Sequence, residues 1–436
     1  MRLMLLAAVS SVALLGAGSA WATGGNNSTI TQSGNSNSAN VDQSTGTNET
    51  STVTQSQDNN SAAINQVGGA SVGNTSTVTQ EQVLDAGTGG ANNAVEVDQF
   101  GANGTSTVVQ DGANAGLVLQ NPGSIGETAL VYQGGQNNGG GALISQNGIG
   151  ETGFVIQTGT SNTAQVIQTG INNASNNKGV VFTQDATAQH VPASFLITVG
   201  AGSEQTGTQD FSSVTQGGLN DFAGNDAIGN FDNQFINQSG ATVQASAFVN
   251  NVGSFDFSSF NQTAGGGFAG NTQLGDHDSI TVTQSGGSRS TVGQGADVTS
   301  LGLQTGPTVG VNFAVASVSQ IGDLQNSRIV QLGAGDQATV SQTENGGTAN
   351  TSIVFQHQGS DGSAASVVQT GQNGHSDVEQ SGASGSAGVN QSGASDTSTV
   401  TQGPGSSDSA SITQASNNDV SAVTQTGSFN TAVVHQ

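Results

Sequence analysis

The sequence predicts an all-β fold, a β-solenoid of stacked two-strand coils of about 22 residues each. Three observations lead to this prediction. A five-residue unit recurs along the chain, its fixed residues alternate with variable ones, and successive copies alternate between two types. Segments rich in Gly, Asn, Ser and Asp separate the copies, and this is the composition of tight turns.

The recurring unit is [Ser/Ala]-x-[Val/Ile]-x-Gln, and it occurs 22 times, from Ser28–Gln32 to Ala432–Gln436. Fixed residues at every second position have the period of a β-strand with one constrained face. We therefore expect each unit to be a short strand. Its small residue, its Val or Ile and its Gln point to one side, and its variable residues point to the other.

In the last quarter of the chain the small residue of the unit alternates strictly between two residue types. The order is Ala316, Ser327, Ala338, Ser352, Ala365, Ser376, Ala387, Ser398, Ala410, Ser421, Ala432. Two strands that take turns form one structural repeat. Like strands then stack at about 4.8 Å, so that Val lies on Val and Gln lies on Gln.

Stacked glutamines can form hydrogen-bonded ladders through a solenoid core. These ladders are the candidate functional element, because here the same contacts would order the chain and join it to others. The candidate glutamines are Gln32, Gln43, Gln55, Gln66, Gln157, Gln168, Gln320, Gln331, Gln342, Gln369, Gln380, Gln391, Gln402, Gln414, Gln425 and Gln436.

Composition restricts the function classes. The chain carries 4 basic against 29 acidic residues, a formal net charge of −25, so nucleic acid and anionic membrane surfaces are not expected as partners. Cysteine is absent, which excludes disulfides and thiolate metal sites. No arrangement of residues indicates catalysis or a cofactor, so we expect a protein that is not an enzyme.

The turn residues complete a known repeat, Q-x-G-x-x-N-x-A-x-x-x-Q. It is matched at every specified position by Gln32 to Gln43 with Gly34 and Asn37, by Gln157 to Gln168 with Gly159 and Asn162, and by Gln425 to Gln436 with Gly427 and Asn430. The chain therefore resembles curlins, the subunits of curli, over most of its length. The resemblance implies a secreted subunit of amyloid fibres on the surface of a Gram-negative bacterium, serving adhesion and biofilm matrix.

The resemblance also implies partners. They are further copies of the chain, a curli-type nucleator and an outer-membrane secretion pore, without insertion into a membrane. The sequence leaves open whether the chain is a major subunit, a nucleator or a minor component. Four segments are expected, namely a secretory signal peptide at 1–22, curlin-like repeats at 23–190, degenerate Phe-rich repeats at 191–275 and curlin-like repeats at 276–436.

In the Phe-rich segment we expect decayed coils with longer loops and a bulge or bend, or alternatively a separate small Phe-cored subdomain. The alternatives for the whole chain are a monomeric surface adhesin and an ice-binding solenoid. The second rests on outward Thr pairs expected on strands of one type, those whose small residue is Ser (Ser-type strands), at 29/31, 52/54, 77/79, 281/283 and 399/401. The triplet Asp276-His277-Asp278 is more typical of a solvated turn than of a metal site.

Overall fold

The computed structural model confirms an all-β solenoid of parallel strands with a spacing of about 23 residues. It describes residues 25–436 apart from 35, 57–58, 68–70, 82–92, 112–113, 137, 161, 172–200, 209, 219–220, 243–244, 295–310 and 344–347. The expected signal peptide and residues 191–200 of the Phe-rich segment lie outside these residues. In the described part, no helix has the length and apolar character needed to cross a membrane.

The strands form two sheets. The first sheet contains β1 (Asn27–Gln32), β3 (Thr50–Gln55), β5 (Thr75–Glu81), β7 (Thr105–Asp111), β9 (Thr128–Gln136), β11 (Thr152–Thr160), β13 (Ala201–Thr208), β15 (Phe222–Asn230), β17 (Ser246–Ser254), β19 (Phe268–Asp276), β21 (Arg289–Gln294), β22 (Val311–Asn312), β24 (Asn326–Gln331), β26 (Thr351–Gln356), β28 (His375–Gln380), β30 (Thr397–Gln402) and β32 (Val420–Gln425).

The second sheet contains β2 (Ser38–Asp42), β4 (Ser61–Asn65), β6 (Ala94–Gln99), β8 (Asn114–Gln120), β10 (Asn138–Ile149), β12 (Thr163–Ile171), β14 (Phe211–Gln216), β16 (Asn233–Thr242), β18 (Phe257–Gly265), β20 (Ser279–Ser285), β23 (Val315–Ile321), β25 (Gln337–Thr343), β27 (Ala364–Gln369), β29 (Ser386–Gln391), β31 (Ser409–Gln414) and β33 (Thr431–His435).

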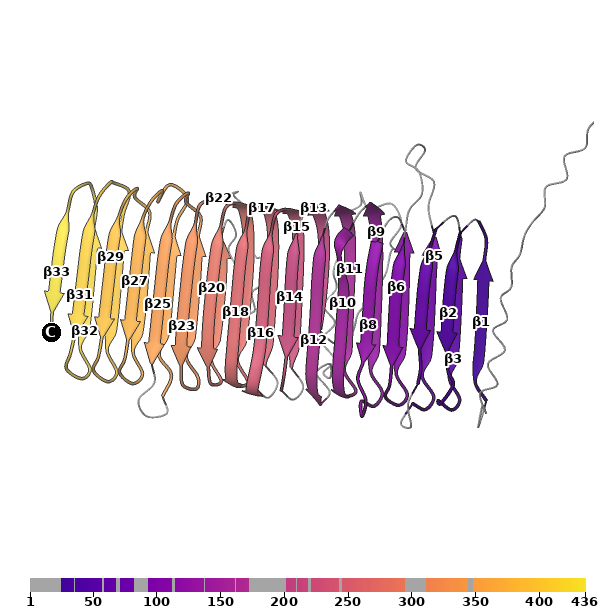
Figure 1. Ribbon diagram of the computed structural model, residues 1–436. Coiled ribbons are helices and arrows are strands. Elements are labelled where there is room, and N and C mark those ends of the chain that lie inside the picture. The colour runs from indigo at the N-terminus through magenta and orange to yellow at the C-terminus, as the bar shows by residue number, and fades with distance from the viewer. Residues whose placement is uncertain are drawn as a thin grey trace, which may run out of the picture.

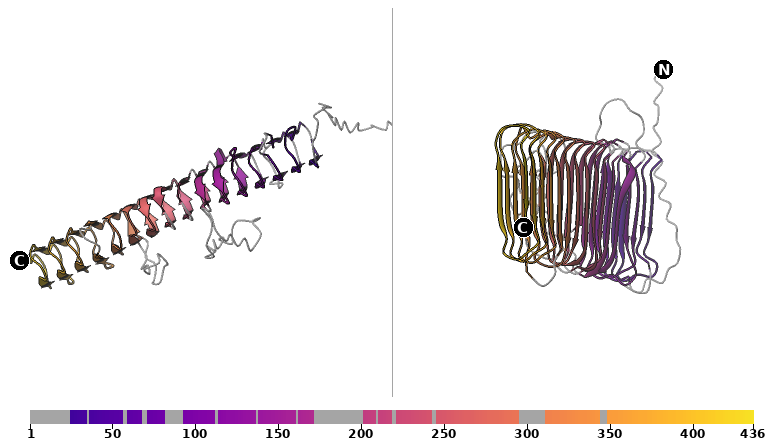
Figure 2. Two further views of the ribbon diagram at one scale, coloured as in Figure 1. Left: turned by 90° about the horizontal axis from the view of Figure 1, so that it is seen from below. Right: turned by 90° about the vertical axis from the view of Figure 1, so that its left-hand side faces the viewer.

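Each coil contributes one strand to each sheet, except that β21 and β22 both pair with β19 in the first sheet, and like strands stack along the long axis (Figure 1). Pairing is parallel and in register, so that Ser398 faces Ser421 and Gln402 faces Gln425 in the first sheet. The described chain is thus a long two-layered stack, with its first and last coils at opposite ends (Figure 2). In the C-terminal coils, Ser-type strands form the first sheet and Ala-type strands the second, as the alternation predicts.

The core lies between the two sheets. In β3, Ser51, Val53 and Gln55 are buried, whereas Thr52 and Thr54 on the opposite face are partly exposed. The same alternation runs through most strands, because side chains of a strand point to opposite faces in turn. The inward positions of the repeated unit therefore form columns of small, branched and Gln side chains along the stack.

The prediction of longer loops in the Phe-rich segment is wrong for its described residues. Phe211, Asn233, Phe257 and Ser279 are register partners, and they are only 22 to 24 residues apart. The strands themselves are longer there, since β17, β18 and β19 have 9 residues each. The bulge is present, as a register shift after Gln238 in β16.

The alternative of a separate Phe-cored subdomain is also wrong for these residues. Strands β13 to β21 pair in register with strands before and after them in both sheets. Only one Phe of the segment, Phe260, is a fully buried core residue of the described chain. Its place is the branched position of the unit, between Ile236 and Val282.

Candidate functional site

The second sheet carries a continuous column of glutamines. In each pair, Nε2 of one Gln donates to Oε1 of the Gln on the next coil towards the C-terminus, at 2.6–3.2 Å. The column contains Gln43, Gln66, Gln99, Gln120, Gln146, Gln168, Gln216, Gln238, Gln262, Gln284, Gln320, Gln342, Gln369, Gln391, Gln414 and Gln436. A buried amide that both donates and accepts in this way is satisfied only when neighbouring coils are present.

The first sheet carries a similar column that is interrupted once. One run is Gln32, Gln55, Gln80, Gln110, Gln133, Gln157 and Gln205, and the other is Gln273, Gln294, Gln331, Gln356, Gln380, Gln402 and Gln425. Ala227 and Asn251 occupy the two positions between them. All sixteen glutamines predicted from the sequence lie in these two columns.

The glutamines also connect the two sheets. Gln380 Nε2 donates to Gln402 Oε1 at 2.8 Å and, with its second hydrogen, to the backbone oxygen of Ala364 at 3.1 Å. Ala364 opens the facing strand β27 of the second sheet. One side chain thus fixes both the stacking of coils and the closure of a coil, which Ala or Val at the same position could not do.

A second polar column runs along the turns that lead into the second sheet; we call it the turn column. Its residue stands immediately before each strand. Asn37 Oδ1 accepts from the backbone N–H of Asn60 at 2.9 Å, and Asn162 Oδ1 accepts from that of Asp210 at 3.1 Å. Asn430 continues the pattern by donating its backbone N–H to Asp408 Oδ1 at 2.9 Å.

The glycine of the repeat serves the turn in two ways. Gly34 and Gly427 have φ of 101° and 105°, a left-handed conformation that costs little only for glycine. At Gly371, which stands at the same place of its repeat, an added Cβ would collide with the backbone oxygen of Gly393 on the next coil. Gly159, expected in a turn, instead lies inside β11, which continues past its Gln.

In the coils from β13 to β21, which we call the middle coils, the turn column consists of aspartates. The sequence prediction missed these residues. Asp210, Asp232, Asp256 and Asp278 are each at most 1% exposed. Burial above all, with a smaller contribution from neighbouring carboxyls, raises their pKa to about 7, 6, 8 and 7 respectively. The signal was present, because Gln205-x-Gly207-x-x-Asp210 is the same repeat with Asp in place of Asn.

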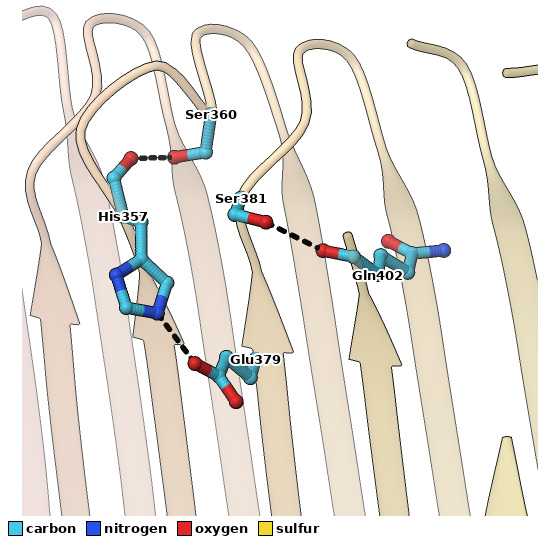
Figure 3. Close-up of polar contacts among 5 residues, drawn as sticks. All are labelled: His357, Ser360, Glu379, Ser381 and Gln402. Atoms are coloured by element: carbon cyan, nitrogen blue, oxygen red, sulfur yellow. Dashed lines mark hydrogen bonds and ion pairs between the residues drawn. The ribbon is translucent and has the colours of Figure 1, made fainter. Parts of the chain in front are cut away.

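The outer faces differ from coil to coil. His357 Nε2 lies 2.7 Å from Glu379 Oε1 on the next coil, and 38% and 50% of the two side chains are exposed. Figure 3 shows this contact on the outer face. Beside them, Ser381 Oγ donates to the backbone oxygen of Gln402, whose amide belongs to the Gln column (Figure 3). Such exposed contacts contribute little to stability.

The outward threonines form only a small array. The pairs at 29/31, 52/54 and 77/79 lie on three neighbouring coils of the first sheet, and the array ends at Val109 and Tyr132. Thr281 and Thr283 lie in the second sheet, so they cannot extend it. The prediction that these pairs belong to one strand type is therefore wrong for β20.

The triplet at 276–278 does not converge on one point. The ring of His277 stacks between Phe255 and Phe313, with centroids 4.8 and 4.9 Å away, whereas Asp278 is buried in the turn column. Across the described ranges, no cluster of three or more His, Asp or Glu side chains is suited to a metal ion. In comparisons of the sequence with known proteins, neither a protein-family model nor a curated protein matches the chain.

Proposed function

We propose that this protein is a structural subunit of extracellular curli-like amyloid fibres, which serve adhesion and biofilm matrix on a Gram-negative bacterium. One observation carries the proposal. The Gln column of the second sheet runs through the whole described stack, the first sheet carries the same column in two runs, and the strands at the two edges of the stack repeat one pattern. β1 and β32 are both Ser-type, and β2 and β33 are both Ala-type.

A second copy therefore fits onto the first as a further coil. Stacking of β1 on β32 and of β2 on β33 would continue both Gln columns, with Gln425 next to Gln32 and Gln436 next to Gln43. Unpaired backbone groups at a sheet edge favour the addition of strands in this way. On this proposal the role is architectural rather than catalytic, and a curli-type nucleator and secretion pore are the expected partners.

Fibre growth by the purified chain tests the proposal. The purified chain without residues 1–22 is expected to convert, after a lag, into fibres that bind thioflavin and give a cross-β reflection at about 4.7–4.8 Å. Two valines of the last strand provide a matched pair of variants, since Val434 packs against the core and Val433 is 74% exposed. Val434→Lys is expected to suppress elongation of wild-type seeds, and Val433→Lys to leave it nearly unchanged.

A chain that keeps a fixed β circular dichroism spectrum and remains monomeric for days would contradict the proposal. So would equal elongation by the two lysine variants, because both add the same charge to the same strand. The monomeric outcome would favour a solenoid adhesin. Thermal hysteresis of that monomer would instead support ice binding through the threonine array of β1, β3 and β5.

A further inference from the structure

The turn column changes from asparagine to aspartate in the middle of the molecule. Asp210, Asp232, Asp256 and Asp278 occupy it on four successive coils, after Asn162. Each Oδ1 accepts a hydrogen bond from the backbone N–H of the column residue on the next coil, at 2.9–3.2 Å. In this respect aspartate replaces asparagine without loss.

The second atom of the side chain distinguishes the two residues. Asn37, Asn60 and Asn430 each donate Nδ2–H to the backbone oxygen four residues earlier, at 2.8–3.1 Å. In the four aspartates the corresponding atom is Oδ2, and each of these oxygens is buried without a hydrogen-bond partner. An ionised carboxylate can only accept, whereas a protonated carboxyl can donate as the amide does.

The charged groups facing these carboxyls are acidic. They are the four aspartates themselves, one coil apart, and Asp276 at the end of β19 in the first sheet. Asp336, farther along the same column, has a different environment. Its Oδ2 accepts from Ser360 Oγ at 2.7 Å and from the backbone N–H of Gly333 at 3.1 Å, so donors are available to its ionised form.

We propose that Asp210, Asp232, Asp256 and Asp278 form a proton-binding column, which completes the turns of the middle coils only when its carboxyls are protonated. The middle coils are then closed in mildly acidic medium and loosened in alkaline medium. Protons act here as the ligand of a buried site. The device belongs to the folding of a single chain and does not rest on fibre assembly.

The direction of the pH dependence follows from linkage. The carboxyls have a pKa of about 6 to 8 in the folded chain, against 3.8 as the ordinary value. Their contribution to stability is therefore fully present below pH 4 and is lost as the pH rises through 6 to 8. A carboxyl whose pKa is about three units higher in the folded state changes the local opening constant by up to about a thousandfold between pH 4 and pH 8.

Hydrogen exchange of the full chain tests the proposal locally. Amides of β14, β16, β18 and β20 are followed at pH 5 and pH 8.5, each corrected for the pH dependence of intrinsic exchange. The opening constant of these strands is expected to rise at least tenfold at pH 8.5, while that of β4 and β6, where Asn60 and Asn93 hold the turn column, stays level. The variant with Asp→Asn at all four positions is expected to remain as protected at pH 8.5 as the wild type is at pH 5.

Two controls separate the column from charge removal in general. Replacement of the outer acids Asp42, Glu96, Asp98 and Glu379 by their amides removes the same charge and is expected to keep the wild-type pH profile. Asp336→Asn is expected to lower protection at both pH values, because the N–H of Gly333 loses its acceptor. If the fourfold variant does not fold, Asp232→Asn with Asp256→Asn provides the same test in two coils.

The proposal is overturned if the fourfold Asn variant retains the pH profile of the wild type. It is also overturned if sodium or calcium ions at pH 8.5 restore protection to the wild type as fully as acid does. In that case a cation rather than a proton would satisfy the column.

Discussion

The C-terminal coils and the middle coils have one backbone plan and different interiors. From β23 to β33 the inward residues follow the repeated unit, strands are mostly 6 residues long and both Gln columns are continuous. From β13 to β21 a Phe enters the core, the Gln column of the first sheet is interrupted and the turn column is acidic.

The difference teaches which parts of the unit the fold requires. Where Asn225 and Asn271 replace a branched residue in the first sheet, each donates its amide N–H to a serine of the facing strand, Ser212 and Ser258 respectively. The middle coils therefore keep the register of the stack and some of its inward hydrogen bonds with other residues, although Asn225 Oδ1 and Asn251 Nδ2 are buried without a partner. In this parallel stack, register is preserved where residue identity is not.

Truncation in the core is expected to give the largest difference between the regions. Phe260 and Val367 occupy the branched position of the second sheet and are at most 1% exposed. Phe260→Ala is expected to destabilise its coil by about 3–5 kcal/mol, and Val367→Ala by about 2 kcal/mol, because the cavity is smaller. Local unfolding free energies from hydrogen exchange would check this. Equal losses would show that Phe260 is loosely packed.

Loss of a column side chain is expected to give the second-largest difference in stability between the two regions. Gln380→Ala leaves the amides of Gln356 and Gln402 without their partner, and we expect a loss of about 2–5 kcal/mol in β28 and its neighbours. Asn251→Ala in the middle coils is expected to cost about 1 kcal/mol. Its Nδ2 has no partner, and only its Oδ1 accepts, from Ser258. Matching losses in the two variants would argue against cooperative stabilisation along the column.

Substitutions at turn residues are expected to give the smallest difference in stability between the two regions. Phe255 and Phe429 both have φ of 64°, a strained conformation for a residue with a bulky side chain. Phe255 stacks with Phe231 at 4.8 Å, whereas the register neighbour of Phe429 is Ser407. Phe429→Gly is expected to stabilise its coil by about 0.5–1 kcal/mol. Phe255→Gly is expected to destabilise by about 1 kcal/mol, since two ring contacts are lost.

Thermal unfolding of the two glycine variants would measure these shifts. The same sign in both variants would mean that the stacked rings of Phe231, Phe255, His277 and Phe313 do not compensate for the backbone strain.

The sequence predicts the fold of the C-terminal coils well, for a physical reason. Period-two alternation determines which side chains face inward, and the Ser and Ala alternation separates the two sheets. The middle coils were harder to predict, because Phe211 and Phe235 suggest a core although they lie on the outer face, where their tilted rings contact each other with centroids 5.3 Å apart. The hydrophobicity of a Phe does not reveal that the alternate residues of its strand, which end in a column Gln, take the inward positions.

The candidate site was only partly predictable. Glutamine at a fixed place of the unit indicated the Gln columns, and the repeat glycine indicated close turns. The left-handed residue before each column residue, such as Phe255, His277 or Ser407, has no sequence signature because many residue types occupy it. The buried state of Asp256 depends on stacking with its neighbours, and no single repeat shows it.

The direction of the Gln bonds has a further consequence. Every Gln–Gln bond of both columns runs from an amide N–H to the oxygen of the next coil towards the C-terminus. Aligned amides polarise one another, so the continuous column of the second sheet acts as a rod with a negative pole at β2 and a positive pole at β33, and each of the two runs of the first sheet is polarised in the same direction. Any assembly that continues the columns is electrically polar along its length, and its two tips are chemically different surfaces.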